Sequence, residues 1–261
     1  MEENVHIDSQ LAQPGSTIYM PAPALRKGLR MPARTKAIIA GLGLLALLVA
    51  GFFGMRIHDS IANAPARYAE SINEAITSGP GLELPVLNSY IDSDNAATKD
   101  AFRSSGYTLI DVEELYSDGN EDENSLDVVK IPKDMNYDDS VALFKNSLRR
   151  ANVLDAAHYL AGSWRFTAYR SEGVDLKVKY SDLQSETIEE AITNAIAAQG
   201  WSDSNFGETG VDQSGNTFQS GSIMINDRNF NWTVSACPLD EVYSVNGLPE
   251  NSFYVGARLV S

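Results

Sequence analysis

The chain has 261 residues, a formal net charge of −15 at pH 7 and a single cysteine. This length is enough for one domain with a sizeable core. The acidic excess argues against binding nucleic acid through the overall electrostatic field, and one cysteine excludes a disulfide within the chain.

The N-terminal part of the sequence predicts a cytoplasmic tail and a membrane span. Residues 1–36 contain four prolines and no periodic apolar pattern, which predicts a disordered tail. Residues 37–55 contain no charged side chain, and a helix of this length spans about 28 Å, close to the thickness of the bilayer core. Five basic residues precede the span and only Arg56 follows it closely, so we expect the N-terminus in the cytoplasm and the C-terminal domain outside the cell.

A cleaved export signal is the alternative to a permanent anchor. The plausible cleavage site, 62–64, is followed by Pro65, which disfavours cleavage, and the apolar run is longer than that of a secretory signal. We therefore expect an uncleaved, single-pass signal-anchor. Within it, Ala46, Ala50 and Gly54 recur every four residues, which is the spacing of close helix contacts in membranes. A homodimer through these three positions is a hypothesis.

The charge changes sign at the predicted span. Residues 1–36 carry a net charge of +2, whereas residues 56–261 carry 15 basic and 32 acidic groups, a net of −17. An exported animal domain of this size would usually contain several cysteines. Since this chain has one, the sequence favours a bacterial cell-surface protein.

Apolar periodicity beyond the span predicts an α+β domain. Residues 56–85 are expected to form a stalk or a first helix, and residues 86–261 an extracytoplasmic domain. We predict helices over 94–105, 138–151, 153–161 and 186–199, and strands over 107–112, 127–131, 164–169, 174–180, 222–226, 230–236 and 253–259. Ser185 is the expected N-cap of the last helix, and residues 227–229 the expected turn between two late strands. Because the hairpins are local, the sheet should be mainly antiparallel.

Two segments of the domain resemble each other. Residues 94–107 and 188–201 both read as a helix that ends in glycine and then an aromatic residue, at an offset of 94. At the same offset Val129, in one predicted strand, matches Ile223 in another. A duplicated helix–loop–strand unit would explain this match, and so would shared helix-stop chemistry. Different strand neighbours for the two units would contradict a duplication.

Most catalytic and metal-binding motifs are missing from the sequence. It has no H-E-x-x-H, C-x-x-C, G-x-S-x-G or S-x-x-K pattern. The acidic loop 118–124 fails as an EF-hand, because positions 6 and 12 are Glu123 and Val129 instead of glycine and glutamate. We therefore expect no metal and no cofactor, and keep a sensor that binds a small ligand or a cation as an alternative function.

One pair of residues suggests an enzyme. Cys237 at the end of a predicted strand, followed by Arg258 on the last strand, resembles the Cys–Arg end of a sortase. The resemblance implies a cysteine transpeptidase, in which the thiolate attacks a carbonyl and the arginine stabilises the developing charge. Sortases carry their histidine nearer to the cysteine, whereas the candidate here is His158 on a predicted helix. The sequence leaves catalysis open, and we expect a non-catalytic role.

The densest basic group of the acidic domain lies on the predicted hairpin 164–180. The partner-binding candidates are Arg165, Arg170, Lys177 and Lys179. They suit an acidic partner or a second copy of the domain, and cross-strand pairing with Glu172 and Asp175 is the alternative. The chain as a whole is interpreted as an anchored interaction or accessory module of a cell-envelope complex, with an unknown protein partner and no nucleic acid.

Overall fold

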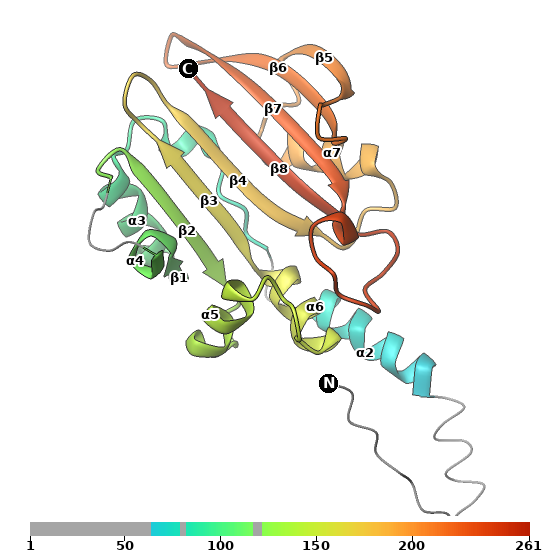
Figure 1. The fold of residues 1–261 in the computed structure, drawn as a ribbon. Coiled ribbons are helices and arrows are strands. Elements are labelled where there is room, and N and C mark those ends of the chain that lie inside the picture. The colour runs from blue at the N-terminus through green and yellow to red at the C-terminus, as the bar shows by residue number, and fades with distance from the viewer. Residues whose placement is uncertain (1–63, 79–81, 117–121) are drawn as a thin grey trace, which may run out of the picture. The chain divides into compact units, whose positions relative to one another are not determined.

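The computed structural model describes residues 64–78, 82–116 and 122–261 (Figure 1). This part of the chain has the predicted α+β fold: a single antiparallel sheet of eight strands with helices packed against it. The strands are β1 (Thr108–Asp111), β2 (Ser125–Ile131), β3 (Trp164–Tyr169), β4 (Asp175–Asp182), β5 (Asn205–Val211), β6 (Thr217–Ile225), β7 (Arg228–Pro238) and β8 (Phe253–Val260). The helices are α2 (Ala64–Ser78), α3 (Asn95–Ser104), α4 (Val112–Tyr116), α5 (Tyr137–Lys145), α6 (Val153–Gly162) and α7 (Ile188–Ala198), with short 3-10 helices η1 (Leu87–Tyr90) and η2 (Leu239–Glu241).

The predicted tail 1–36 and membrane span 37–55 lie outside the described residues. None of the helices in the described ranges combines the length and the apolar character that crossing a bilayer requires. The segment expected to be a stalk or a first helix contains α2. This helix buries Ile72 and Ile76 in a cluster with α6, so it packs on the domain.

The sheet consists of two meanders of four strands that meet in the middle. The strand order is β1-β2-β3-β4-β8-β7-β6-β5, and every neighbouring pair is antiparallel. Each meander follows a helix, α3 in the first half and α7 in the second, and runs from an edge of the sheet to its centre. The matched strands β2 and β6 are both the second strand of their half, so their neighbours correspond. The structure thus has the strand order that a duplicated unit requires.

The helix–Gly–aromatic segments occupy the same place in both halves. Gly106 after α3 and Gly200 after α7 have φ angles of 81° and 72°, the left-handed conformation of a helix C-cap. The aromatic residue that follows each glycine then packs on a tryptophan of the third strand of its own half. Tyr107 lies 5.7 Å from Trp164, and Trp201 lies 5.4 Å from Trp232, between ring centroids.

The two faces of the sheet differ in what covers them. We call the face that carries Trp164, Trp232 and the other large apolar strand residues the covered face. It packs against α3 and α7, and its core buries all three tryptophans of the chain. We call the opposite side the open face. There a second apolar cluster with α2, α5 and α6 covers the β1–β2 end, where Val129 and Ile131 are buried.

The predicted hairpin is confirmed, and so is its alternation: Trp164, Phe166 and Ala168 are buried on β3, while Leu176 and Val178 are buried on β4. The predicted helix 138–151 is wrong in length, since α5 ends at Lys145. The chain then turns through Ser147 and Leu148 with φ of 48° and 59°, and Leu148 is 2 % exposed. Burial of the Leu148 side chain in the second cluster accompanies this turn.

Three further details differ from the prediction. Strand β5 was not predicted, because its sequence NFGETGV contains two glycines and lies exposed at the sheet edge without an apolar period. The N-cap of α7 is Thr187, whose hydroxyl accepts from the Glu190 N–H, whereas Ser185 donates to Asp182. The β6–β7 turn is formed by residues 226–227 with φ of 52° and 59°, a turn that matches the twist of a hairpin.

Candidate functional site

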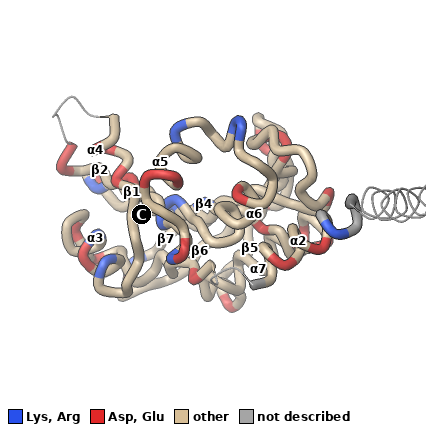
Figure 2. The backbone as a smooth tube through the Cα atoms, turned by 90° about the horizontal axis from the view of Figure 1, so that it is seen from below, with Lys and Arg blue, Asp and Glu red and all other residues tan. Residues whose placement is uncertain are grey.

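Basic side chains gather on the open face near the centre of the sheet. In the strand register Lys177 lies opposite Arg258, and Lys179 lies opposite both Arg165 and Gly256. We call Arg165, Lys177, Lys179 and Arg258 the cationic face. Acidic residues are spread around the outside of the molecule, on α2, α4 and α5 among other elements (Figure 2). The cationic face is therefore a local exception to the charge of the domain.

Two of these four cations are neutralised within the sheet. Arg165 donates from Nε to Asp127 Oδ1 at 2.8 Å and also pairs through its terminal nitrogen. Arg258 holds Asp175 through two hydrogen bonds of 2.8 and 2.7 Å. Lys177 and Lys179 have no carboxylate within 4.0 Å among the described residues. Of the two acidic residues predicted to neutralise the patch, Asp175 pairs with Arg258, which was not a predicted patch residue, and neither forms an ion pair with Arg165, Lys177 or Lys179 among the described residues.

The surroundings of Lys179 disfavour its positive charge. Burial lowers the pKa of its ammonium group, and the like charges of Lys177 and Arg165 lower this pKa further, against a smaller opposing contribution from Asp127. Its Nζ also lies 5.9 Å from the centroid of the Tyr254 ring. An anion bound beside Lys179 would offset both the burial and the repulsion.

A hollow of about 410 Å³ adjoins the two lysines on the open face. Its lining comes from five segments that lie side by side in the sheet. The lining residues are Lys177 and Lys179 of β4, Gly256 and Arg258 of β8, Thr233 and Ser235 of β7, Phe218 of β6 and Asp212 beyond β5. The hydroxyls of Thr233 and Ser235 make no hydrogen bond with any described residue, so both remain available to a bound group.

Arg170 lies apart from the other partner-binding candidates. Its guanidinium donates to the Tyr90 carbonyl and to Thr98 Oγ1, both at 3.2 Å, and bonds Asn95. These contacts tie the end of β3 to η1 and α3. Arg170 therefore serves the packing of the first half of the sheet, and the cationic face contains Arg258 in its place.

The three residues of the sortase-like alternative do not come together. Cys237 lies opposite Tyr254, whereas Arg258 lies opposite Thr233, four residues along β7, a separation of about 13 Å at about 3.3 Å per residue. His158 on α6 bonds Asp134 at 2.9 Å, and Arg258 is held by Asp175. Burial also raises the pKa of the Cys237 thiol, which disfavours a thiolate.

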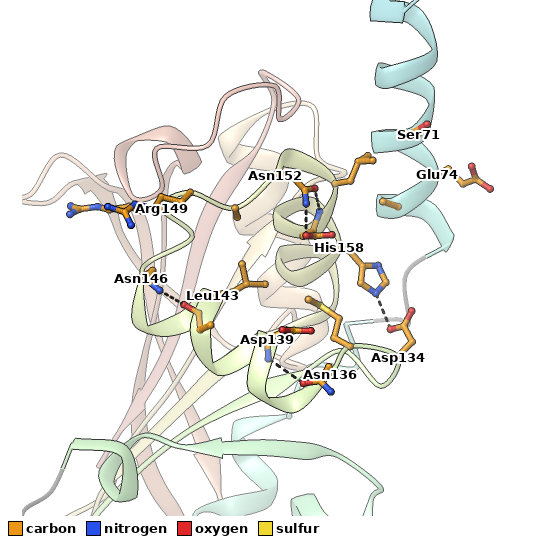
Figure 3. Close-up of a pocket in the computed structure, with 17 residues that line it drawn as sticks. Ser71, Glu74, Asp134, Asn136, Asp139, Leu143, Asn146, Arg149, Asn152 and His158 are labelled. Atoms are coloured by element: carbon orange, nitrogen blue, oxygen red, sulfur yellow. Dashed lines mark hydrogen bonds and ion pairs between the residues drawn. The ribbon is translucent and has the colours of Figure 1, made fainter.

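A larger hollow, of about 930 Å³, lies elsewhere in the described residues. It is a groove between α2 on one side and α5 and α6 on the other, and it contains the His158–Asp134 pair (Figure 3). Most of its polar side chains already serve the fold. Asn136 caps α5 and Asn152 caps α6, since each accepts hydrogen bonds from backbone N–H groups of its helix. The groove is consequently a weaker candidate for ligand binding than the open face.

No group of three or more His, Cys, Asp or Glu residues is placed to hold a metal ion within the described ranges. Comparison of the chain with protein families, with curated proteins and with solved structures finds no significant match. The candidate site therefore depends on its own geometry alone.

Part of this site was missed by reasoning from the sequence. Strand alternation places Arg258 on one face of β8 and Thr233 and Ser235 on one face of β7, but it does not say which strands are neighbours. The pairing of β8 with both β4 and β7 brings these residues to the lysines. No local pattern in the sequence gives that pairing.

Proposed function

We propose that this chain is a non-catalytic interaction module, held at a bacterial cell membrane by residues 37–55, whose cationic face binds an acidic segment of a protein partner in a cell-envelope complex. The observation that carries the proposal is the position of Lys177 and Lys179: two lysines without a carboxylate partner among the described residues, beside a hollow with free hydroxyls. The membrane location comes from the sequence.

The charge distribution supports an acidic partner. A domain with a net charge of −17 repels acidic segments everywhere except where basic residues gather. A partner that carries carboxylates is thus favoured at areas where basic residues gather, and the cationic face is one such area. Binding of this kind weakens with added salt, because exposed charges are screened within about 8 Å at physiological ionic strength.

The experiment compares two charge reversals in the full-length chain expressed in its own membrane. Lys177→Glu/Lys179→Glu changes the cationic face, and Lys133→Glu/Lys145→Glu makes the same change in net charge at two exposed lysines elsewhere. Cross-linking in intact cells followed by mass spectrometry measures the amount of partner that is cross-linked to each variant. We expect the first variant to lose the cross-linked partner by at least about tenfold, and the second to keep it.

Equal cross-linking in both variants would overturn the proposed function. Equal expression and equal thermal unfolding midpoints of the two variants establish that the loss comes from the surface and not from misfolding. Since all four lysines lie outside the apolar clusters, neither double variant is expected to change the midpoint by more than a few degrees.

A further inference from the structure

Gly256 forms the floor of the hollow on the open face. It lies on β8, between Lys179 on β4 and Ser235 on β7, and pairs with both in the register. A Cβ at this position would lie 3.6 Å from Ser235 Oγ and 3.7 Å from Lys179 Cγ. Any side chain here would therefore occupy the space between the lysine and the serine.

The backbone does not require glycine at this position. Gly256 is not among the residues with a left-handed φ, and a Cβ would make only ordinary van der Waals contacts. Glycine weakens the interior of a strand, because it has no side chain to pack. What glycine provides at position 256 is space, directly between a charged side chain and a hydroxyl.

The groups around this space can bind an oxyanion from two sides. Lys179 and Ser235 face each other across β8, two strand spacings apart, about 10 Å between backbones. The Lys179 ammonium and the Ser235 hydroxyl are both hydrogen-bond donors, and Phe218 supplies an apolar wall beyond them. An anionic group on an apolar stem fits this combination.

The net charge of the residues that line the hollow favours a ligand with a single negative charge. Arg258 is neutralised by Asp175, whereas Lys177, Lys179 and, at the far end of the hollow, Asp212 have no ion-pair partner among the described residues. The Asp212 carboxylate accepts hydrogen bonds from Ser214 and Asn216. The hollow thus has one net positive charge. A carboxylate carries one negative charge, whereas a phosphate monoester carries between one and two at pH 7.

We propose that the hollow above Gly256 is a binding site for a single carboxylate, presented by an Asp or Glu side chain of the acidic partner segment, with Lys179 and Ser235 as its donors. The carboxylate bonds the lysine ammonium on one side and the serine hydroxyl on the other, and the methylene stem of the acidic residue lies against Phe218. This site rests on the proposed function and names the contact through which it acts.

The test uses the full-length chain in detergent micelles and a fluorescein-labelled hexaglutamate peptide, with binding followed by fluorescence anisotropy at low salt. Gly256→Val places a branched side chain on the floor of the hollow, between Lys179 and Ser235, and keeps every charge. Ser222→Val is the matched control, because it adds the same side chain to β6 on the same face, outside the hollow. We expect Gly256→Val to weaken peptide binding about tenfold and Ser222→Val to leave it unchanged.

Three outcomes decide between the two proposals. Suppose that Gly256→Val binds the peptide as the wild type does, while Lys177→Glu/Lys179→Glu does not bind it. The proposed carboxylate site above Gly256 is then overturned, and the proposed binding of an acidic partner by the cationic face stands. If both variants bind as the wild type does, both proposals fail. If inorganic phosphate displaces the peptide at lower concentration than acetate does, the assignment to a carboxylate is overturned.

If the fold required glycine at position 256, Gly256→Val would lower the thermal unfolding midpoint. Valine has a higher strand propensity than glycine, so the thermal unfolding midpoint of Gly256→Val should not fall. A folded variant with a normal midpoint and weakened peptide binding supports the site. Ser235→Ala, which removes one donor and fills no space, gives an independent measurement and is expected to weaken binding several-fold.

Discussion

The two halves of the sheet share a plan and differ in the connections between their strands, most of all between the second and the third strand. Each half consists of a helix, a left-handed glycine, an aromatic residue and a meander of four strands. In the first half, α5 and α6 lie between β2 and β3 and cover the open face at that end. In the second half a two-residue turn joins the equivalent strands, β6 and β7, so no helix lies there.

This difference places the candidate site. Lys177, Lys179 and Arg258 of the cationic face lie where β4 of the first half meets β8 of the second, whereas Arg165 on β3 lies beside Phe144 of α5. The shared parts build the covered face and its core. The part that differs leaves polar and charged side chains of β4, β7 and β8 exposed on the other side. The covered face thus stabilises the fold, and the open face of the same sheet carries the candidate site. Substitutions on each face test the comparison of the two halves.

The largest loss of stability is expected for substitution of the tryptophan on the third strand of each half. Both Trp164 and Trp232 are 1 % exposed and lie under the aromatic residue of their own half. Trp164→Ala and Trp232→Ala should each lower the free energy of unfolding by about 3–5 kcal/mol, through lost burial and the cavity left behind. Urea denaturation measures both. Phe206→Ala, at a side chain that is 54 % exposed, is the control and should cost far less.

A large loss at one tryptophan only would contradict the equivalence of the halves. Trp232 Nε1 donates to Ser204 Oγ at 2.8 Å, whereas Trp164 Nε1 is buried without a partner in the described structure. A slightly larger cost for Trp232→Ala is therefore consistent with equivalence, since it also breaks a hydrogen bond that is worth about 1 kcal/mol.

An intermediate effect is expected at the helix-ending glycines. Gly106→Ala and Gly200→Ala force a Cβ into a left-handed conformation, although that Cβ would meet no atom within 4 Å. Each substitution should cost about 1–2 kcal/mol, from the backbone alone. Since both caps have the same geometry, the two losses should agree. Thermal unfolding of the two variants checks this, and losses that differ by several-fold would show that the two helix ends are not equivalent.

Local patterns in the sequence predicted much of the fold. The β3–β4 hairpin was predicted correctly because alternation shows directly which side chains are buried, and α3 and α7 because glycine ends both helices. The helix predicted over 138–151 was too long, because tertiary burial of Leu148 decides the turn after α5. Strand β5 was missed because an exposed edge strand needs no apolar period.

Only the part of the candidate site that lies on the β3–β4 hairpin could be predicted from the sequence. Lys177 and Lys179 alternate with buried residues of β4, so the sequence shows that they share the exposed face. Arg170 follows β3 directly, yet its side chain turns to Thr98 of α3, which no pattern in the hairpin indicates. Arg258 and Gly256 join the site through the pairing of β4 with β8, a contact between the two halves of the chain that local periodicity does not encode.

The smallest effect is expected at the ion pair that joins the halves. The hydrogen bonds from Arg258 on β8 lower the pKa of Asp175 on β4, with burial opposing. A carboxyl whose pKa is lower in the folded state contributes stability above its ordinary pKa near 3.8, and this contribution is lost as the pH falls through the lower folded value. Since both side chains are partly exposed, Asp175→Asn should cost only about 0.2–1 kcal/mol at pH 7.

The pH dependence separates this pair from the remaining acidic surface. The difference in free energy of unfolding between wild type and Asp175→Asn should shrink as the pH falls below 3.8, because the wild-type carboxyl then becomes neutral as well. Asp203→Asn, at an exposed carboxyl without a hydrogen-bond partner in the described structure, should show no such difference at either pH. Urea denaturation at pH 7 and at low pH measures both variants. A cost of Asp175→Asn that stayed constant with pH would mean that packing of the side chain, and not the charge of the pair, connects β4 to β8.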